Sequence, residues 1–447
     1  MMASLWDSAA RAGNRPRAAL HAPAASLALA DLAHGSCLGG RLEALRGRSV
    51  LLAMREQLSS AIALIELDGV ARRLVLCTPE LSAEALREVA AAAGTDTELT
   101  DLDPKPVSAP IERRASEATE WILLTSGTTG TPKLVAHSFA TLAGTLPRQA
   151  PGSAAVWSTF YDIRRYGGLQ IYLRALLAGV PLVLSSPQES TAQFLARAGA
   201  GGVTHISGTP SHWRRALMSG ALALLQPEYV RLSGEVADQV LLDQLRAAYP
   251  GARIAHAFAS TEAGVAFDVD DGLAGFPAEL LDRPRNGIEM RVEDGTLRIR
   301  SGRIAAGYLG SGARALGDAQ GYVDTGDLVE LEKGRYYFRG RKGGVINVGG
   351  LKVYPEEVEG VLNADPRVRM SRVRPKRNPI MGALVVAEVV LEDGAGSGLG
   401  AADEQTLRKE LLESCRRALP AHKVPARLTF VPALELTAAG KLVRPDA

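Results

Sequence analysis

The sequence has little of what marks several classes of protein. Its three cysteines, Cys37, Cys77 and Cys415, lie far apart without metal-ligand spacing, so we expect reduced thiols in a hydrophobic core. Lysine and arginine (51) nearly balance aspartate and glutamate (49), and no long basic run occurs, which disfavours nucleic acid as a partner. There is no secretion signal, and no apolar run approaches the roughly 20 residues of a membrane-spanning helix. These absences predict a soluble, cytoplasmic protein.

Length and composition indicate a folded protein of more than one domain. The chain has 447 residues, of which 46% are hydrophobic and 22% are charged, an ordinary mixture for a core-forming protein. A single hydrophobic core usually stops growing at roughly 250–300 residues. We therefore expect at least two domains.

Strand-like and helix-like segments alternate through the first half of the chain. The runs at 49–53 and 73–77 are short, apolar and bounded by turn residues, whereas 82–93 begins with a serine suited to cap a helix and has helical spacing. The same alternation recurs at 121–125 and from 237 to 258. This pattern is typical of α/β proteins and predicts a large N-terminal domain of mostly parallel sheets with covering helices.

The pattern changes in the second half of the chain. Alternation around Asp294 and Gly295 predicts a β-hairpin within a local β region. Four glycines at 341–350 favour a hinge. After the hinge we expect, in order, a helix, a strand, a glycine-rich loop and a helix, at 355–363, 383–391, 394–400 and 404–419. The predicted domains are 1–340, and a small α+β domain at 341–447.

The sharpest motif directly follows the apolar strand at 121–125. It consists of Thr125, Ser126, Gly127, Thr128, Thr129, Gly130, Thr131, Pro132 and Lys133. Glycines let the backbone wrap closely around phosphates, hydroxyls and amides donate to the oxygens, and a lysine offsets their charge. A Walker loop is excluded because Leu134, rather than Ser or Thr, follows the lysine. We interpret the motif as a phosphate loop rather than a flexible polar turn.

This loop resembles that of the adenylate-forming superfamily, which includes acyl-CoA synthetases, carrier-protein-loading adenylation domains and firefly luciferase. Further motifs follow in the family's order, so the resemblance covers nearly the whole chain. It implies ATP- and Mg²⁺-dependent conversion of a carboxylic acid to an acyl adenylate, with release of pyrophosphate and then transfer to a thiol. It also implies a C-terminal domain that moves between two poses. The phosphate loop begins early for the family, which predicts a trimmed N-terminal subdomain and suggests a homodimer.

A second motif, Phe258-Ala259-Ser260-Thr261-Glu262, resembles the family's aromatic-Gly-x-Thr-Glu sequence. In the family the aromatic residue lies by the adenine, Thr meets the phosphate and Glu binds magnesium. A carboxylate is a hard oxygen ligand suited to Mg²⁺, which offsets charge as the acid attacks the α-phosphorus. The resemblance implies catalytic roles for Thr261 and Glu262, and nucleotide contacts for the three residues before them. Taken alone, the segment would indicate a strand followed by a helix cap.

Two further motifs resemble the family's ribose and lysine sites. Asp327, in a Thr-Gly-Asp sequence, is expected to accept both ribose hydroxyls, and Arg341 follows at the family's distance and also contacts ribose there. Lys441, in a Gly-Lys sequence, corresponds to the lysine that bridges carboxylate and α-phosphate during adenylation. Without the other motifs, these would indicate a surface turn and a solvated lysine.

The hinge departs from the family's pattern. The hinge position, commonly Asp or Lys, corresponds to Gly343, and a position usually occupied by Lys corresponds to Asn347. Glycine is freer in φ and ψ, so rotation remains possible while the balance between the two poses is altered.

The acyl pocket of the family is lined by the segment after the phosphate loop and by residues before the aromatic-Thr-Glu motif. Two arginines occupy positions where a histidine is common, and a guanidinium there can bind a second carboxylate or stack on an aromatic acid. The alternative is a loop with solvated arginines. We predict an aryl or compact acid in a pocket formed by Tyr161, Arg164, Arg165, Tyr166, Gly167, Gly208, Thr209 and Gly234.

The acceptor of the acyl group is open, since coenzyme A, the phosphopantetheine of a carrier protein acting in trans, and amines all react with adenylates on this architecture. Basic residues at 367–377 can meet a phosphate of coenzyme A or an acidic carrier protein, or form a solvated face. We predict an acid–thiol ligase that uses coenzyme A. A non-catalytic nucleotide-binding protein is the rival, but both Glu262 and Lys441 are present. Kinase signatures are absent.

Overall fold

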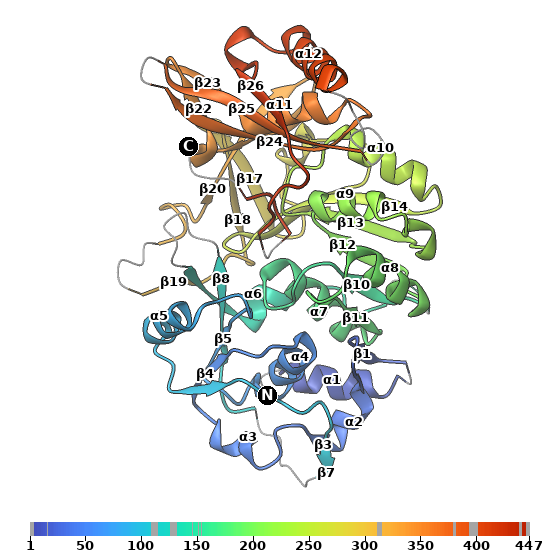
Figure 1. Ribbon diagram of the computed structural model, residues 1–447. Helices are drawn as coiled ribbons and strands as arrows, with labels where there is room; N and C mark the ends of the chain where they lie inside the picture. The colour runs from blue at the N-terminus through green and yellow to red at the C-terminus, as the bar shows by residue number, and fades with distance from the viewer. Residues whose placement is uncertain are drawn as a thin grey trace.

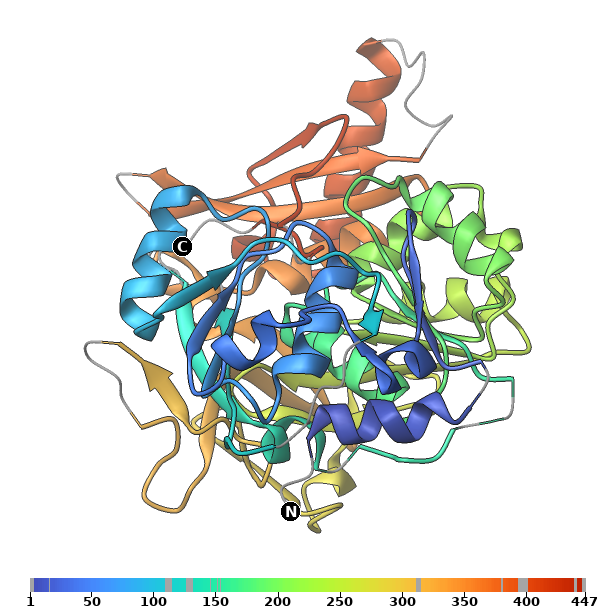
Figure 2. The ribbon, with the colours of Figure 1, turned by 90° about the horizontal axis from the view of Figure 1, so that it is seen from below.

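A computed structural model describes residues 4–15, 17–108, 115–125, 132–144, 146–150, 152, 154–310, 315–378, 381–392, 401–437 and 440–443. Within these ranges the strands form four larger sheets and a two-stranded sheet of β3 (Gly35–Ser36) and β7 (Val107–Ser108). Three larger sheets precede residue 342, and the fourth belongs to the C-terminal part. Figures 1 and 2 show this part, in orange to red, at the opposite end of the molecule from the N-terminal helices.

The largest sheet has the strand order β15-β14-β13-β12-β10-β11-β1-β2, parallel between β14 and β1 and antiparallel at both edges. Its strands are β1 Ala19–His21, β2 Ser26–Ala28, β10 Trp157–Thr159, β11 Leu182–Leu184, β12 His205–Gly208, β13 Tyr229–Ser233, β14 Arg253–Ser260 and β15 Gly264–Val269. The helices that connect them are α7 Tyr166–Ala178, α8 Thr191–Ala200, α9 Pro210–Met218 and α10 Gln239–Ala248. Because parallel strands end at one edge, the residues after β10, β12, β13 and β14 gather there.

The second sheet has the order β19-β9-β8-β5-β4-β6, with β8, β5, β4 and β6 parallel. Its strands are β4 Ser49–Leu52, β5 Arg73–Leu76, β6 Thr97–Leu99, β8 Glu120–Thr125, β9 Lys133–Ser138 and β19 Gly307–Leu309. Helices of this region are α1 Leu5–Gly13, α2 Leu29–Ala33, α3 Arg41–Ala44, α4 Gln57–Leu67, α5 Ala83–Ala93 and α6 Phe139–Ala143. The predicted Ser82 cap is confirmed, since its side chain accepts from the Ala85 amide.

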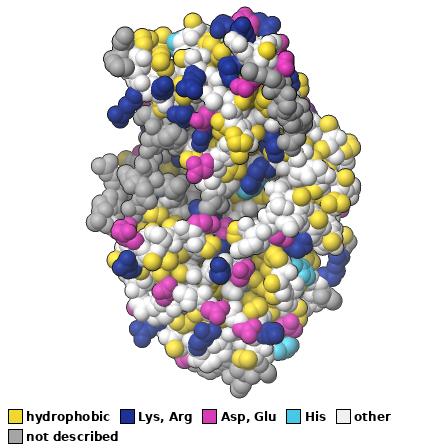
Figure 3. All heavy atoms as spheres, viewed as in Figure 1, with side chains coloured by type: hydrophobic (Ala, Val, Ile, Leu, Met, Phe, Trp, Pro, Cys, Tyr) yellow, Lys and Arg dark blue, Asp and Glu magenta, His cyan; other side chains and the backbone are white. Residues whose placement is uncertain are grey.

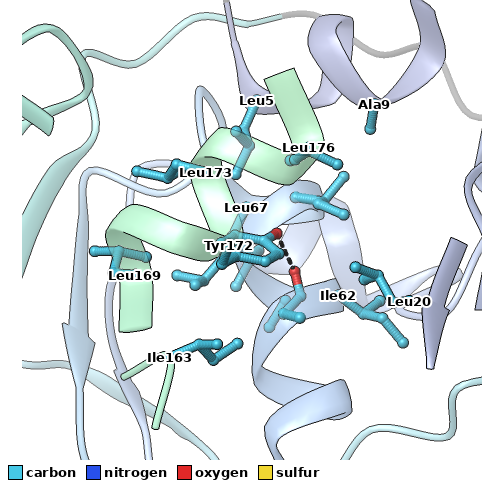
Figure 4. Packing of buried hydrophobic residues seen from close by; sticks show 14 of the residues in the cluster. Leu5, Ala9, Leu20, Ile62, Leu67, Ile163, Leu169, Tyr172, Leu173 and Leu176 are labelled. Atoms are coloured by element: carbon cyan, nitrogen blue, oxygen red, sulfur yellow. Dashed lines mark hydrogen bonds between the residues drawn. The ribbon is translucent and has the colours of Figure 1, made fainter. Parts of the chain in front are cut away.

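Helix α7 joins the first two sheets through the core. Every residue of α4 is buried, as expected for a helix with no polar face. Figure 4 shows Tyr172 of α7 among Leu5, Ile62, Leu67, Leu169 and other apolar side chains of one cluster. Its hydroxyl donates to the carbonyl of Ala61 at 2.8 Å, which satisfies the one polar atom of the ring. This packing fixes the start of α7, where two of the predicted pocket residues lie.

The third sheet is antiparallel and forms the predicted β region. Its order is β16-β21-β20-β18-β17, and its strands are β16 Phe276–Pro277, β17 Ile288–Glu293, β18 Thr296–Ser301, β20 Val323–Glu332 and β21 Arg335–Arg341. The predicted hairpin is confirmed, because Asp294 and Gly295 join β17 to β18 with φ of 52° and 73°. Two successive positive φ angles match a two-residue turn of this kind.

The C-terminal part has its own core. Its strands are β22 Ile346–Val348, β23 Leu351–Val353, β24 Val368–Asn378, β25 Gly382–Leu391 and β26 Arg427–Phe430, and its helices are α11 Pro355–Asn363 and α12 Ala401–Ala418. The buried residues of this sheet and these helices form a separate cluster. We call residues 342–443 the small domain and the preceding residues the large domain. The boundary at 340/341 falls at the end of β21 and stays a prediction, as does the loop at 394–400, which lies outside the described residues.

None of the helices that the structure describes combines the length and the low polarity needed to cross a bilayer.

Candidate active site

The segment around Lys441 lies against the large domain. Thr209 Oγ1 donates to the carbonyl of Gly440 at 2.8 Å, and the amide of Leu442 donates to Glu235 Oε1 at 3.0 Å. A β-carbon added to Gly234 would lie 3.1 Å from Lys441 Cε and 3.5 Å from Nζ. In Figure 1 the dark red C-terminal segment accordingly runs from the small domain toward α9 and β13. The lysine therefore reaches the edge of the largest sheet.

Four charged groups act electrostatically on the Lys441 ammonium. Burial lowers the pKa of Lys441, Glu235 and Asp327 act against this, and Arg341 and Arg165 add to the lowering. The residue is exposed, so water near the ammonium limits this lowering. Lysine, ribose-motif residues and one pocket arginine, each predicted from a different segment, are thus brought together.

The predicted ribose pair is formed, and it leaves one oxygen free. Arg341 Nε donates to Asp327 Oδ1 at 3.1 Å, while Asp327 Oδ2 is buried without a hydrogen-bond partner. Burial raises the pKa of Asp327, against the effect of Arg341. A buried acceptor without a partner is costly. The arrangement fits a ligand that donates a hydroxyl.

Glu262 lies beside a tyrosine that the sequence did not single out. Tyr308 in β19 donates from its hydroxyl to Glu262 Oε1 at 3.1 Å, and Lys133 Nζ lies 5.5 Å from the centroid of the Tyr308 ring. Burial and the nearby carboxylate raise the pKa of Tyr308 to about 12. The described residues contain no cluster of three or more His, Cys, Asp or Glu side chains that could hold a metal alone. A single carboxylate fits Mg²⁺ that arrives with phosphates and water as its other ligands.

A buried histidine supports Thr261. His137 in β9 places Nε2 2.8 Å from the carbonyl oxygen of Thr261, and its Nδ1 lies 3.0 Å from Thr141 Oγ1. Burial lowers the pKa of His137 to about 4, although the bond to Thr261 opposes this, so the ring is neutral at pH 7. Since the carbonyl can only accept, Nε2 carries the proton. No motif marks this histidine in the sequence.

The other residues of the aromatic-Thr-Glu segment pack against the third sheet and the core. The Phe258 ring stacks on Phe338 with centroids 5.3 Å apart and planes 9° apart. Ala259 packs against the main core cluster, and Ser260 Oγ accepts from the amide of Ala263 at 3.0 Å. The segment is therefore held on both sides of the ring that is predicted to meet adenine.

Most of the phosphate loop lies outside the described residues. The loop residues outside the described ranges are Ser126, Gly127, Thr128, Thr129, Gly130 and Thr131. The two ends of the loop are placed, because Thr125 ends β8 and pairs with Lys133 at the start of the antiparallel strand β9. The loop thus begins and ends between two hydrogen-bonded strands.

The two neighbouring arginines face different surroundings. Arg164 is buried, with Nε donating to Asp162 at 2.8 Å and Nη1 donating to the carbonyl of Met54 at 2.5 Å. Arg165, the N-cap residue of α7, makes a weak contact to Thr78 Oγ1 at 3.5 Å, and its Nε is buried without a partner. Arg164 is therefore occupied within the protein, and Arg165 alone of the two keeps a free donor.

The other residues predicted to form the acyl pocket differ in what they contact. The Tyr161 hydroxyl donates to the carbonyl of Ser233 at 2.6 Å, and a β-carbon on Gly167 would touch the Tyr161 ring at 3.5 Å. The Tyr166 ring lies 5.7 Å from that of His137. A β-carbon on Gly208 would come within 2.7 Å of Phe160. A residue larger than glycine at 208 would therefore clash with the Phe160 ring.

The hinge and the basic strand of the small domain are also placed. Gly343 lies in a short 3₁₀ helix, Lys342–Gly344, and Asn347 is exposed in β22. Both Arg372 and Arg374 in β24 pair with Glu388. On the face shown in Figure 3, positive and negative side chains are interspersed. The basic residues at 367–377 are therefore partly neutralised within the domain.

Known proteins share both the sequence and the fold. The 2-succinylbenzoate–CoA ligase of Geobacillus kaustophilus is 30% identical over 352 residues, which cover 72% of this chain and 67% of that protein. The ligase of the same name from Salmonella typhimurium is 31% identical over 280 residues, and the chain spans only 58% of its length. The o-succinylbenzoate–CoA synthetase of Bacillus subtilis, solved with its acyl-adenylate intermediate, has a TM-score of 0.77 at 20% identity and covers 98% of this chain and 97% of that one.

Two family models match the chain in order. Residues 41–309 match the AMP-binding enzyme model, and residues 357–441 match the AMP-binding enzyme C-terminal domain. The predicted fold class is confirmed by the α/β sheets and by their likeness to solved structures. The predicted resemblance to adenylate-forming enzymes is confirmed as well. Because the first model alone extends over more than half of the chain, this protein belongs to the AMP-binding enzyme family.

Proposed function

We propose that this chain, an AMP-forming acid–thiol ligase by family, activates an aryl or otherwise compact carboxylic acid and transfers it to coenzyme A. In the first step a carboxylate oxygen of the acid attacks the α-phosphorus of ATP, and pyrophosphate leaves. In the second, a thiolate attacks the acyl carbon and AMP leaves with the bonding electrons. The observation that carries the proposal is the convergence of Lys441 with Asp327, Arg341 and Arg165.

In the first step Lys441 supplies positive charge where the carboxylate and the α-phosphate approach each other. Both partners are anionic, so their approach is opposed until a cation lies between them. Asp327 Oδ2, buried and without a partner, accepts a ribose hydroxyl, and Arg341 holds the opposite carboxylate oxygen. The nucleoside is thereby fixed while the lysine acts on the phosphate beside it.

The phosphates and adenine occupy the segments around β8 and β14. We assign the phosphates to Thr125–Gly130, Lys133 and Thr261, and the adenine to the side of Phe258 and its two following residues. The carbonyl of Thr261 is held by His137 at 2.8 Å, which fixes the backbone that presents its side chain. Magnesium, when bound with ATP, offsets phosphate charge, and Glu262 is the residue that would hold it.

The acid lies near the start of α7. Arg165 has a buried Nε without a partner and acts on Lys441 electrostatically, so it lies within reach of the reacting carboxylate. A second carboxylate or a carbonyl group on the acid would satisfy this donor. The relatives named as 2-succinylbenzoate–CoA ligases act on an aryl acid by name, which favours this class of substrate.

Coenzyme A is the acceptor that the relatives' names favour. A carrier protein acting in trans and a homodimer remain predictions. The partly neutralised strand β24 supports neither acceptor specifically.

The test is ATP–pyrophosphate exchange with aryl, dicarboxylic and fatty acids, followed by addition of coenzyme A to the best acid. We expect acid-dependent exchange, highest with an aryl dicarboxylate, and a fall of about a hundredfold or more in Lys441→Ala. Turnover of long-chain fatty acids in preference to benzoates would refute the substrate class. Absence of exchange with every acid, in a protein that binds ATP, would refute the activity.

A further inference from the structure

Two hydrogen bonds from the large domain hold the residues on either side of Lys441. Thr209 donates to the carbonyl of Gly440 at 2.8 Å, and Glu235 accepts from the amide of Leu442 at 3.0 Å. The backbone of the lysine is therefore fixed at both ends by residues of the other domain. Side-chain contacts to Lys441 itself are not needed for this restraint.

Both of these large-domain residues are held at the start of α9, although Glu235 itself follows β13. Thr209 is the N-cap of α9, and its Oγ1 accepts from the amide of His212 at 3.0 Å. Glu235 accepts from the amide and hydroxyl of Ser211 at 2.9 and 3.0 Å. Carboxylates at a helix start are favoured by the helix dipole and by its unpaired amides. Glu235 is thus already oriented when it meets Leu442.

The approach of the segment depends on glycine at 440. Gly440 has φ of +70°, and a β-carbon there would lie 2.0 Å from His212 Cε1 and Nε2. The imidazole cannot easily yield, because it is buried and stacks on Phe160 with centroids 5.3 Å apart. Any larger residue at 440 would push the segment away from α9.

The small domain shapes the same segment from its own side. The amide of Thr437 donates to the carbonyl of Lys441 at 2.7 Å, and Arg372 Nη1 donates to the carbonyl of Val443 at 3.1 Å. The lysine therefore lies in a turn that is held by hydrogen bonds within its own domain. This turn contacts the start of α9. The two sides meet as preformed surfaces.

We propose that Thr209, Glu235 and Gly440 form a docking contact that positions Lys441 for acyl-adenylate formation. This inference rests on the proposed function and gives Thr209, Glu235 and Gly440 a positioning role that the motifs do not assign to them. The contact joins the domains only while the segment lies on α9. Its loss lowers the rate of the step in which the lysine acts and leaves the transfer of a preformed adenylate unaffected.

The main test compares the two half-reactions in Glu235→Gln. The glutamine oxygen can still accept from the Ser211 amide, whereas its NH₂ group would face the Leu442 amide with a donor. We expect ATP–pyrophosphate exchange to fall about tenfold or more, with transfer from synthetic acyl-AMP to coenzyme A within about twofold of wild type. Equal loss in both half-reactions, or no loss in either, would overturn the proposal.

Glu189→Gln is the matched control. Glu189 is a largely buried carboxylate that accepts from Arg197 Nε at 2.6 Å and Nη2 at 2.7 Å, and both contacts lie within the large domain. Its loss is expected to lower the melting temperature without changing the ratio of the half-reactions. A changed ratio in this control would show that general destabilisation, rather than docking, is being measured.

Gly440→Ala tests the contact by a substitution in the small domain. We expect the same selective loss of exchange, and no further loss when it is combined with Glu235→Gln, because either change alone undocks the segment. Fully additive losses would contradict a single docking contact. This variant keeps the test decisive if Glu235→Gln folds poorly.

A measurement without substrate separates this inference from the proposed activity. Trypsin cleaves after lysine, so docking is expected to protect the bond after Lys441. Cleavage there should be several-fold faster in Glu235→Gln and Gly440→Ala than in wild type, measured by mass spectrometry of intact chains. Equal rates would refute docking whether or not the wild type shows exchange, and absent exchange with protected Lys441 would refute only the activity.

Discussion

The segment after β13 and the β20–β21 pair both present a carboxylate near Lys441, but the two carboxylates differ in how they are satisfied. Glu235, after β13, accepts from Ser211 and Leu442 through both oxygens. Asp327, in the middle of β20, binds Arg341 through one oxygen and keeps the other buried without a partner. A satisfied carboxylate holds protein segments together, whereas an unsatisfied one is prepared for a ligand.

The same difference separates the arginines at the start of α7. Arg164 is bound to Asp162 and to backbone carbonyls, whereas Arg165 retains a buried Nε without a partner. Buried polar atoms without a hydrogen-bond partner thus lie near Lys441. The groups that do have partners hold the neighbouring helices and strands in place. Changes to satisfied groups should lower stability, and changes to open groups should lower ligand affinity.

The largest expected effect follows from replacing the two arginines in turn. Arg164→Ala leaves Asp162 buried without its cation, and breaking a buried pair in this way costs about 3 kcal/mol or more in the free energy of unfolding. Arg165→Ala removes only weak contacts to the protein. It is expected to change stability by less than about 1 kcal/mol and to raise the KM for the acid by about tenfold.

Urea unfolding and exchange kinetics on both variants make this comparison. Each arginine serves as the control for the other, since the two are adjacent in the chain and have the same side chain. A large loss of stability in Arg165→Ala, or an altered acid KM in a stable Arg164→Ala, would show that the assignment of the two arginines is reversed.

Sequence motifs identified the residues that face a ligand better than the residues that only hydrogen-bond within the protein. Asp327, Arg341 and Lys441 were predicted from separate motifs, and the structure brings them together. The sequence also placed Gly234 and Glu235 beside the pocket but gave the Glu235 side chain no role. Its contact to Leu442 joins residues far apart in the chain, and only the packing of one domain on the other creates it.

Contacts made by strand pairing were equally beyond the motifs. Tyr308 reaches Glu262 because β19 pairs with β9, and nothing in the local sequence specifies that partner. Likewise, the sequence could not decide which of Arg164 and Arg165 turns inward. Segments with clear periodicity, such as β4 and α5, were predicted almost to the residue. The helices α1 to α3 are short, so their formation depends on tertiary packing, and the sequence did not predict them.

The second prediction tests the open oxygen of Asp327. Asp327→Asn is expected to raise the KM for ATP about tenfold, because the amide cannot accept with both of its terminal atoms. Burial raises the pKa of this carboxyl, so the native state binds the proton more tightly than the unfolded chain and loses stability as pH rises through these pKa values. Without the charge, the variant should therefore gain stability relative to wild type at pH 8 and not at pH 4.

Asp271→Asn is the control for this variant. Its carboxylate pairs with Arg335 at 2.6 Å, and its pKa is lowered by that arginine and by the Leu273 amide, against burial. It should lose stability at pH 8 and leave the KM for ATP unchanged. If Asp327→Asn behaved in the same way, its free oxygen would have no role in nucleotide binding.

The smallest expected effect concerns Glu262, whose carboxylate is satisfied on one side only. Tyr308→Phe removes the hydroxyl bonded to Oε1 while keeping the ring near Lys133, so Glu262 loses orientation but not charge. A hydrogen bond of this kind contributes about 1 kcal/mol, which predicts a rise of about fivefold in the Mg²⁺ concentration that half-saturates exchange. Tyr322→Phe loses an equivalent 3.1 Å bond to Glu289 and should leave that concentration unchanged. Equal Mg²⁺ dependence in both variants would place the metal away from Glu262.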